Sequence, residues 1–224
     1  CSLIYSSDKQ LYSTVQMMDQ IMVIDIENLE IEGSISTEFG SMDGHDTDCE
    51  SFEIMEDCMG AGCNWNFDMS MCMNNQDVMN TPHFIALDEI NGYWFLTTIA
   101  SGFVAQFSLV NNSLIDTYFV GDAPALLAVD PVNQKVYCSR MMPMGGGMMP
   151  SAESNIIQGL SYSPMGLSEG INQIYELESP APHGLAINED GTEIYTASNT
   201  ADWLYKINTI THEIQGVVMD SNVG

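Results

Sequence analysis

Three stretches of the chain repeat one pattern, and this repeat constrains the fold more than any other feature. They are TPHFIALDEINGYWFLTTIASGFVAQFSL from Thr81, APALLAVDPVNQKVYCSRM from Ala123 and APHGLAINEDGTEIYTASNTADWLYKIN from Ala181. Each runs from a proline through an apolar strand and a turn built on Asp, Asn or Gly into a second strand rich in aromatic and β-branched residues. Strand pairs that recur about every 40–45 residues are typical of β-propeller blades.

An earlier copy of the pattern lies in LYSTVQMMDQIMVIDIENLEIEGSIS, where Met22 to Ile26 is the expected third strand and Glu30 to Ser34 the fourth. Pro82 to Pro124 fits one blade. The interval from Pro124 to Pro182 is longer, and we expect its Met, Gly and Ser stretch at 141–170 to be a loop inserted between strands. We predict an all-β fold, a β-propeller of four-stranded blades with residues 1–40 as the first blade, 41–80 as a small disulfide-rich insertion and 81–224 as further blades.

The ring is expected to be incomplete in this sequence. Propellers close with about 4–8 blades, and the repeat-bearing segments supply about four at the usual repeat length. The sequence stops at Gly224 directly after a predicted outer strand, with no strand that would join the first and last blades. We therefore expect this to be the N-terminal part of a longer propeller, or the missing blades to come from elsewhere.

The net charge of the chain indicates which classes of partner are unsuitable. The chain has four Lys plus Arg against 31 Asp plus Glu, a formal net charge of −27. Nucleic acids and anionic membranes are bound through basic patches, so this composition argues against both. The sequence alone leaves open whether the acidity is a general surface property or includes a specific site.

The N-terminal Cys1 is what a lipoprotein carries after removal of its signal peptide. Two interpretations stay open: Cys1 is lipidated, or it is merely where a fragment begins. No run approaches the roughly 20 apolar residues of a transmembrane helix, so membrane contact is expected only through such an anchor. The expected location is extracytoplasmic: an outer-membrane lipoprotein, the cell surface or the secreted medium.

Four cysteines, Cys49, Cys58, Cys63 and Cys72, are crowded into CESFEIMEDCMGAGCNWNFDMSMC. Zinc sites normally use thiols separated by two to four residues, and only the middle pair comes near that spacing. Two disulfides that staple a loop-rich insertion fit better and indicate an oxidising compartment, although three pairings are open.

The segment just before this cluster, MDGHDTDCESFE, alternates carboxylates with other residues. Carboxylates on a loop can wrap a hard cation such as calcium, but the order does not match an EF-hand loop. A calcium loop and a solvated acidic loop are the two hypotheses. The candidate ligands are Asp43, Asp46, Asp48 and Glu50.

A second unusual loop is SRMMPMGGGMMPS, in a chain with 17 Met. Its glycines and prolines oppose a regular element, so its thioethers are expected near the surface, where they would select Cu(I). The alternatives are that the loop contacts a partner or that it has no specific role. Cys138 on the preceding strand is expected to be a buried thiol or a further copper ligand. The candidate thioethers are Met141, Met142, Met144, Met148 and Met149.

The repeat with PHGLAINEDGTEIYTASNTADWLYKINTITHEIQGVV resembles the bacterial YVTN or YncE-like propellers, over most of residues 3–40, 81–140 and 172–219. The same pattern resembles that of nitrous oxide reductase, in which channel histidines at such positions hold a copper cluster. His83 and His183 occupy equivalent positions here, whereas the repeat from Ala123 has Ala125 at that position. The resemblance implies two imidazoles at the channel, suited to copper, zinc or iron, or a turn signature of the family.

The leading hypothesis is a binding or scaffold propeller that also binds copper or another soft metal, with a protein partner at the cell surface such as an outer-membrane transporter. The alternatives are a copper metalloenzyme resembling nitrous oxide reductase and a lactonase-type hydrolase. No catalytic residues are assigned, because hydrolase and nucleotide-binding motifs are absent. Paired carboxylates such as Asp88 with Glu89 fall in predicted hairpin turns, where they serve turn geometry.

Overall fold

The computed structural model describes residues 3–7, 9–37, 54–55, 57, 64–66, 71–73, 80–121, 123–141 and 154–219. These residues form four antiparallel four-stranded sheets, here called blades A to D, and one two-stranded sheet. The strands are, in blade A, β1 (Leu3–Tyr5), β2 (Gln10–Val15), β3 (Gln20–Asp25) and β4 (Glu30–Ser36); in the two-stranded sheet, β5 (Asn64–Asn66) and β6 (Met71–Met73); in blade B, β7 (Pro82–Asp88), β8 (Tyr93–Thr98), β9 (Phe103–Ser108) and β10 (Leu114–Phe119); in blade C, β11 (Pro124–Asp130), β12 (Lys135–Arg140), β13 (Ile156–Ser163) and β14 (Gly166–Glu176); and in blade D, β15 (Pro182–Ile187), β16 (Glu193–Ser198), β17 (Trp203–Asn208) and β18 (Ile214–Val218).

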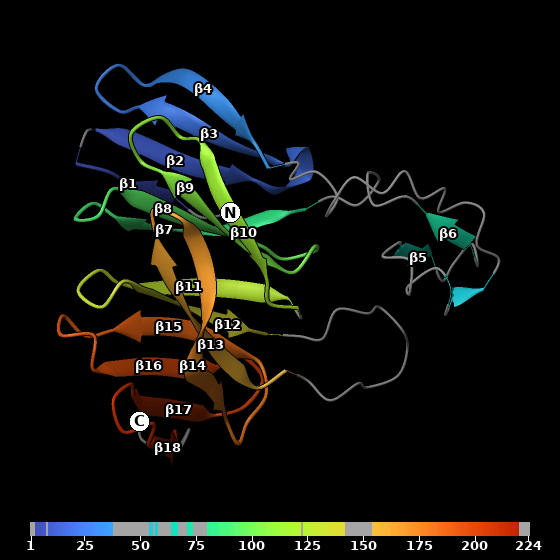
Figure 1. The fold of residues 1–224 in the computed structure, drawn as a ribbon, viewed down its shortest axis with the longest axis vertical. Helices are drawn as coiled ribbons and strands as arrows, with labels where there is room; N and C mark the ends of the chain where they lie inside the picture. Colours follow the sequence, from blue (N-terminus) through green and yellow to red (C-terminus); the bar gives the residue numbers. More distant parts are fainter. Residues whose placement is uncertain are drawn as a thin grey trace.

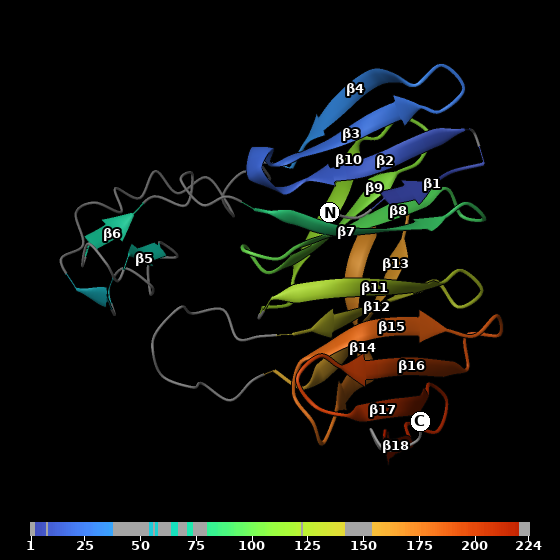
Figure 2. The ribbon, with the colours of Figure 1, turned by 180° about the vertical axis from the view of Figure 1, so that it is seen from behind.

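The blades follow one another in an open arc. Blades A and D lie at opposite ends of the molecule, with B and C between them (Figure 1). Seen from behind, the inner strands β1, β7, β11 and β15 lie towards the viewer, and β11 runs between β7 and β15 (Figure 2). The predicted all-β propeller of four-stranded blades is confirmed.

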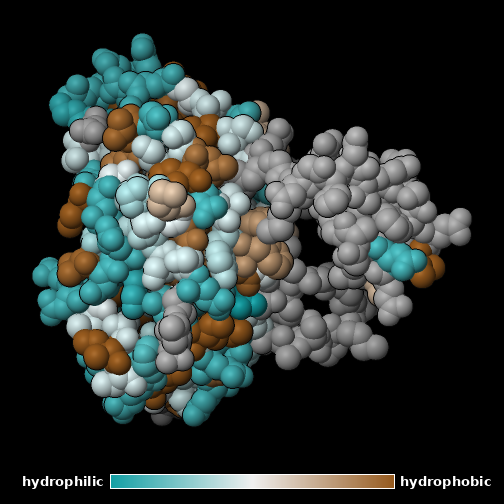
Figure 3. All heavy atoms as spheres, in the orientation of Figure 1, coloured by the Kyte–Doolittle hydropathy of each residue, from teal (hydrophilic) through white to brown (hydrophobic). Residues whose placement is uncertain are grey.

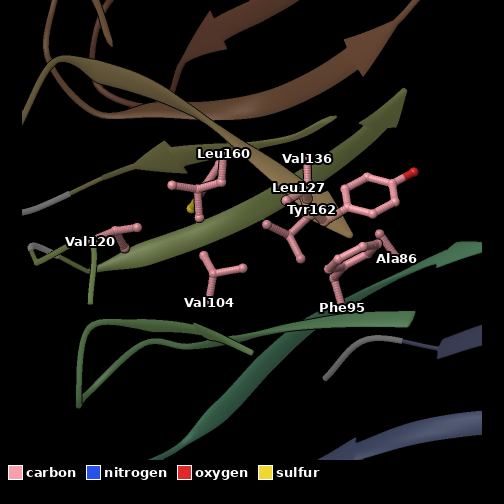
Figure 4. Close-up of a cluster of buried hydrophobic side chains, with 9 residues drawn as sticks. Ala86, Phe95, Val104, Val120, Leu127, Val136, Leu160 and Tyr162 are labelled. Carbon is pink, nitrogen blue, oxygen red and sulfur yellow. The ribbon is translucent and has the colours of Figure 1, made fainter. Parts of the chain in front are cut away.

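Each pair of neighbouring blades encloses its own hydrophobic cluster. The cluster between A and B is built around Trp94, and that between C and D around Tyr137 and Tyr205. The middle cluster lies between B and C (Figure 4). Its buried members are Ala86, Phe95, Val104, Val120, Leu127, Val136, Cys138, Leu160 and Tyr162.

Strand alternation explains how blade B serves two clusters. In β8, Trp94 and Leu96 belong to the cluster shared with blade A, while Phe95 between them belongs to the cluster shared with blade C. Successive side chains of a strand point to opposite faces of its sheet, so a strand that is apolar throughout packs against both neighbours. The continuous run YWFLTT in β8 is therefore the sequence of an interior blade.

The inner-strand turns of blades B and C are built on buried aspartates, as the turn interpretation of Asp88 predicted. Asp88 accepts hydrogen bonds from the backbone of Ile90 and Asn91, and Asp130 repeats the arrangement in blade C. The hydroxyl of Tyr162 donates to Asp88 Oδ2 at 2.5 Å, which ties the turn of blade B to blade C. These carboxylates stabilise turns.

Two expectations about strand positions had different outcomes. The third and fourth strands of the first blade are confirmed as β3 and β4. The inserted loop expected over 141–170 is wrong for its second half, because β13 and β14 pair there as the outer hairpin of blade C. The polar residues in β13 and β14 made this segment look like a loop in the sequence.

No helix in the described parts of the chain is long and apolar enough to cross a membrane.

The Cys-rich insertion contains the β5–β6 hairpin, in which Trp65 pairs with Cys72. Cys72 is buried and disulfide-bonded. The other three cysteines of the segment, Cys49, Cys58 and Cys63, lie outside the described residues, so the number and pairing of the disulfides stay predictions.

Candidate functional site

The inner strands of blades B and D begin in the same unusual way. Thr81 and Ala181 have left-handed backbones, with φ of 55° and 53°, and each is followed by a proline and a histidine. The pairing register then shifts between Pro82 and Phe84, and in the same manner in blade D. Such bulges re-aim a side chain, and left-handed conformations of residues other than Gly cost about 1–3 kcal/mol unless the surroundings enforce them.

The residue at each strand entry also accepts a backbone hydrogen bond, in blade C as well as in blades B and D. The carbonyl of Thr81 accepts from the amide of Ile99 at 3.0 Å, and the carbonyl of Ala181 accepts from Asn199 at 2.8 Å. In blade C the carbonyl of Ala123 accepts from Met141 at 3.0 Å. Met141 thus occupies the position equivalent to Ile99 and Asn199, at the same end of the propeller.

The structure brings the two repeat histidines together. The ring centroids of His83 and His183 are 6.5 Å apart, with the ring planes at 62°. Blade C lies between their blades, and its equivalent residue is Ala125, whose methyl group is buried.

Gln16, in the turn between β2 and β3, fixes the first of these rings. Its Nε2 lies 2.8 Å from His83 Nδ1. The two ends of an amide are exchangeable, so Gln16 can also present its oxygen to a protonated Nδ1, and Nε2 of His83 is then a lone-pair donor. A partner on the second nitrogen commonly orients metal-binding histidines.

Burial lowers the pKa of His83 below its ordinary value of 6.5, and the charge of His183 lowers it further. The ring is therefore neutral at pH 7, which is the form that binds metals. His83 is less protonated in the folded than in the unfolded chain below pH 6.5, so its contribution to stability falls as the pH falls.

Replacement of His183 by glutamine is expected to raise the pKa of His83, because a positive neighbour is removed while burial stays. The measurement is an NMR titration of the His83 ring protons in both proteins. An unchanged or lower pKa in His183→Gln would show that the two rings do not interact in solution.

Two imidazoles that share an ion lie slightly closer together than these rings do. A metal bonded to an imidazole nitrogen at about 2.0–2.1 Å lies about 3 Å from the ring centre, so two rings on one ion stand at most about 6 Å apart, and a shared ion would draw the rings in from the 6.5 Å found here. Within the described segments no group of three or more His, Cys, Asp or Glu is placed to hold a metal. A third ligand would be a thioether or an amide, or would come from residues outside those segments.

The Cys-rich insertion is attached at this same end, through a buried carboxylate. Asp19 Oδ2 accepts from the amide of Asn80 at 3.0 Å and Oδ1 from the amide of Thr81 at 2.6 Å. The carbonyl of Asp19 accepts from the amide of Thr37, and Asn80 Nδ2 donates to the carbonyl of Thr37 at 2.7 Å. The residues that flank the insertion are therefore held to each other, next to the entry of His83.

Several predicted ligands lie outside the described residues. These are Met142, Met144, Met148 and Met149 of the Met loop, the acidic residues Asp43, Asp46, Asp48 and Glu50, and Cys1. Cys138 is a free thiol in the core between B and C, and burial raises its pKa to about 12. The buried thiol that the sequence predicted is therefore confirmed, and Cys138 packs in the core.

Solved structures establish the architecture. The chain folds as about half of a β-propeller. It matches a streptogramin B lyase structure with a TM-score of 0.64 at 10% identity, over 99% of this chain and 55% of that one. It matches a hydrazine synthase from Kuenenia stuttgartiensis with a TM-score of 0.64 at 12% identity, over 97% and 48%.

A putative 6-phosphogluconolactonase from Bacteroides uniformis gives a TM-score of 0.61 at 16% identity, over 98% of this chain and 55% of that one. The chain thus spans about half the length of these structures. No protein-family model matches it, and no curated protein matches its sequence. Identities this low establish the fold and leave function to the site.

Gln16 and Asp19 were missed by the sequence analysis. Both come from the QMMDQ turn of blade A and act on blade B, 61–67 residues further along the chain. An alignment of the QMMDQ turn with the turns after Thr98 and Ser198 would have placed Gln16 and Asp19 at the end of the propeller that carries the histidines. It would not have identified the residues that they contact, because these come close only when the blades pack.

Proposed function

We propose that this chain is part of an extracytoplasmic binding propeller that captures a soft metal ion, Cu(I), at the end where His83 and His183 meet. The observation that carries the proposal is the pair of half-buried imidazoles 6.5 Å apart. Neutral imidazole and thioether together favour copper over hard cations. Met141 begins the Met-rich segment at this end, which makes further thioethers available from the sequence.

The proposed setting is the cell surface. Cys1 as a lipid anchor, a calcium loop before the Cys-rich insertion, and a surface protein partner such as an outer-membrane transporter belong to this proposal. Both long segments, the Cys-rich insertion and the Met-rich loop, are attached at the end that carries the histidines, so a partner docked there would meet the metal.

The two enzyme hypotheses find less support. A lactonase-type site needs carboxylates that line the channel, and the three buried carboxylates of the described residues, Asp19, Asp88 and Asp130, accept hydrogen bonds from backbone amides. A multinuclear copper cluster needs more imidazoles than two, and Ala125 replaces the third. A binding role requires only the two imidazoles of His83 and His183.

Elemental analysis after Cu(I) loading, with competition against a chromogenic chelator, tests the proposal. One copper per chain is expected, with affinity reduced at least tenfold in His83→Ala and in His183→Ala, because loss of a ligand costs no less than loss of an outer-shell partner. His212→Asn is the matched control: His212 is exposed on the β17–β18 turn with φ 62°, a conformation that Asn tolerates.

A variant with Leu at Met141, Met142, Met144, Met148 and Met149 separates the contribution of the loop. Loss of copper in this variant alone would move the site to the loop and refute the histidine site. Wild-type protein without stoichiometric copper would refute the soft-metal proposal as a whole and leave a propeller that binds through its surface.

A further inference from the structure

Six hairpin turns of the propeller expose a large apolar side chain. Each of the six is between 70% and 91% exposed, and Met17 is the only other large apolar residue of the described ranges that is exposed to this extent. Turns ordinarily carry Gly, Pro, Asn, Asp or Ser, and a side chain this exposed adds little to the core. We call these residues the turn-tip set: Leu29, Ile90, Val110, Val132, Met165 and Ile210.

The six turns lie at one end of the propeller. Each joins the first strand of a blade to the second (an inner turn) or the third to the fourth (an outer turn), and in an antiparallel blade both kinds of turn lie at the same end. His83 and Met141 belong to the opposite end. The inner turns point to the left in Figure 1, and along the left margin of the same view hydrophobic groups stand among hydrophilic ones (Figure 3).

Single exposed apolar residues are ordinary on protein surfaces. The unusual feature here is their placement, because six of the seven most exposed ones gather on the turns of one end. Random scatter would distribute them over the outer strands and over both ends. This concentration is what indicates an interaction surface.

Five of the six residues are held in the same way. The backbone amide of each donates a hydrogen bond of 3.0–3.3 Å to the side chain of the residue two positions earlier. These bonds fix the turn and therefore the direction of the apolar side chain. A group that is ordered before binding loses less entropy when it binds. The five acceptors are Asp88, Ser108, Asp130, Ser163 and Asn208.

Neighbouring turns are also joined to each other. Asn91 Nδ2 donates to the carbonyl of Pro131 at 2.9 Å, and Gln134 Nε2 donates to Asn91 Oδ1 at 3.2 Å, which connects the inner turns of blades B and C. The amide of Leu109 donates to the carbonyl of Gly92 at 2.9 Å, which connects the outer turn of blade B to its inner turn. The tips of these turns are therefore fixed relative to one another.

Exposed carboxylates lie on the turns of the same end. The two cations that the structure describes there are Lys9, which is ion-paired with Glu27, and the half-buried Lys135. A surface of apolar points among negative charges is complementary to one of apolar recesses among lysines and arginines. The exposed carboxylates are Glu27, Glu89, Glu189, Asp190 and Glu213.

We propose that this end of the propeller is a docking face for a partner protein whose contact surface has apolar recesses surrounded by lysine and arginine. A lipid surface is less suitable, because surfaces that lie on membranes combine apolar residues with Lys and Arg rather than with carboxylates. A second copy is opposed by the net charge of −27 on each chain. The proposal does not rest on the copper site, which lies at the opposite end.

Hydroxyl-radical footprinting of the protein in a native extract of its source cells, compared with the purified protein, tests this. Because the core of an interface excludes water, Ile90, Val132 and Ile210 are expected to be oxidised about fivefold more slowly in the extract. Leu114, which is 45% exposed on the outer strand of blade B, is the internal control and should keep its rate. Salt at about 1 M, where the Debye length is about 3 Å, should abolish the protection.

A variant with Thr at Ile90, Val132 and Ile210 tests the apolar contacts without changing the charge. Substitutions at exposed positions leave stability nearly unchanged, so the variant should fold. In its extract, Leu29 and Val110 are expected to be oxidised at the rate of the purified protein. Leu114→Thr is the matched control variant and should keep both residues protected.

Four results would overturn the proposal. Equal oxidation rates in the extract and in the purified protein would show that these turns face solvent. Protection that survives the salt and is reproduced by phosphatidylcholine vesicles would assign the face to lipid, and protection of the purified protein that falls on dilution would assign it to a second copy. Continued protection of Leu29 and Val110 in the triple variant would show that the tips do not make the contact.

Discussion

Replacement of Trp94 by alanine is expected to lower the free energy of unfolding by about 3–5 kcal/mol, the usual cost of deleting a buried indole. Trp94 is fully buried between blades A and B and stacks on Phe107 with centroids 3.9 Å apart. Its Nε1 donates to Asn112 Oδ1 at 3.1 Å. Since domains are stable by about 5–15 kcal/mol, this change removes a large part of the total. Urea unfolding followed by circular dichroism measures it.

Trp94→Phe is the matched control. A phenyl ring keeps the stack on Phe107, and Asn112 Oδ1 still accepts from the hydroxyl of Tyr12 at 3.1 Å, so a cost of about 1–2 kcal/mol is expected from the smaller ring and the lost hydrogen bond. A loss below 1 kcal/mol in Trp94→Ala would mean that the A–B interface does not hold the arc together.

Replacement of Asp19 by alanine is expected to destabilise the protein by about 3 kcal/mol, because hydrogen bonds to charged groups contribute about 1.5–3 kcal/mol each. The amides of Asn80 and Thr81 lose their acceptor. Asp19 also has φ 47°, a backbone that Ala adopts poorly. Amide hydrogen exchange at Asn80 and Thr81, beside urea unfolding, measures the effect.

Asp19→Asn separates the acceptor from the backbone. Asparagine tolerates the left-handed conformation and keeps one acceptor oxygen, so about half the cost is expected. Because Thr81 leads directly into Pro82 and His83, copper affinity should weaken in the order wild type, Asp19→Asn, Asp19→Ala. Unchanged exchange protection of Asn80 and Thr81 in Asp19→Ala would rule out this carboxylate as the clamp of the insertion.

Local strand patterns predicted the blades well where each strand pair has its own sequence signal. β7 with β8 and β15 with β16 follow Pro, apolar strand, Asp- or Asn-based turn and aromatic strand, and they form as expected. β13 and β14 failed this test. Their alternation of polar and apolar residues around Gly166 resembles a loop in the sequence, but β13 pairs with β12 and the apolar side chains of the hairpin pack in the clusters between blades.

The candidate site was likewise predicted in part from the sequence. Repeat alignment alone placed His83 and His183 at equivalent strand entries. It did not give the distance between their rings, because this depends on how blades B, C and D pack against one another. The contact of Gln16 with His83 joins residues 67 positions apart, and no local pattern encodes it.

The sequence by itself determined the repeat, the all-β class, the Pro-His entries and the shortage of cations, because these depend on side-chain type and spacing along the chain. Only the tertiary structure decided that the rings of two histidines from non-adjacent blades lie close together and that Asp19 holds the residues that flank the insertion. These depend on the angle and distance between packed sheets, which are set by side chains far apart in the sequence.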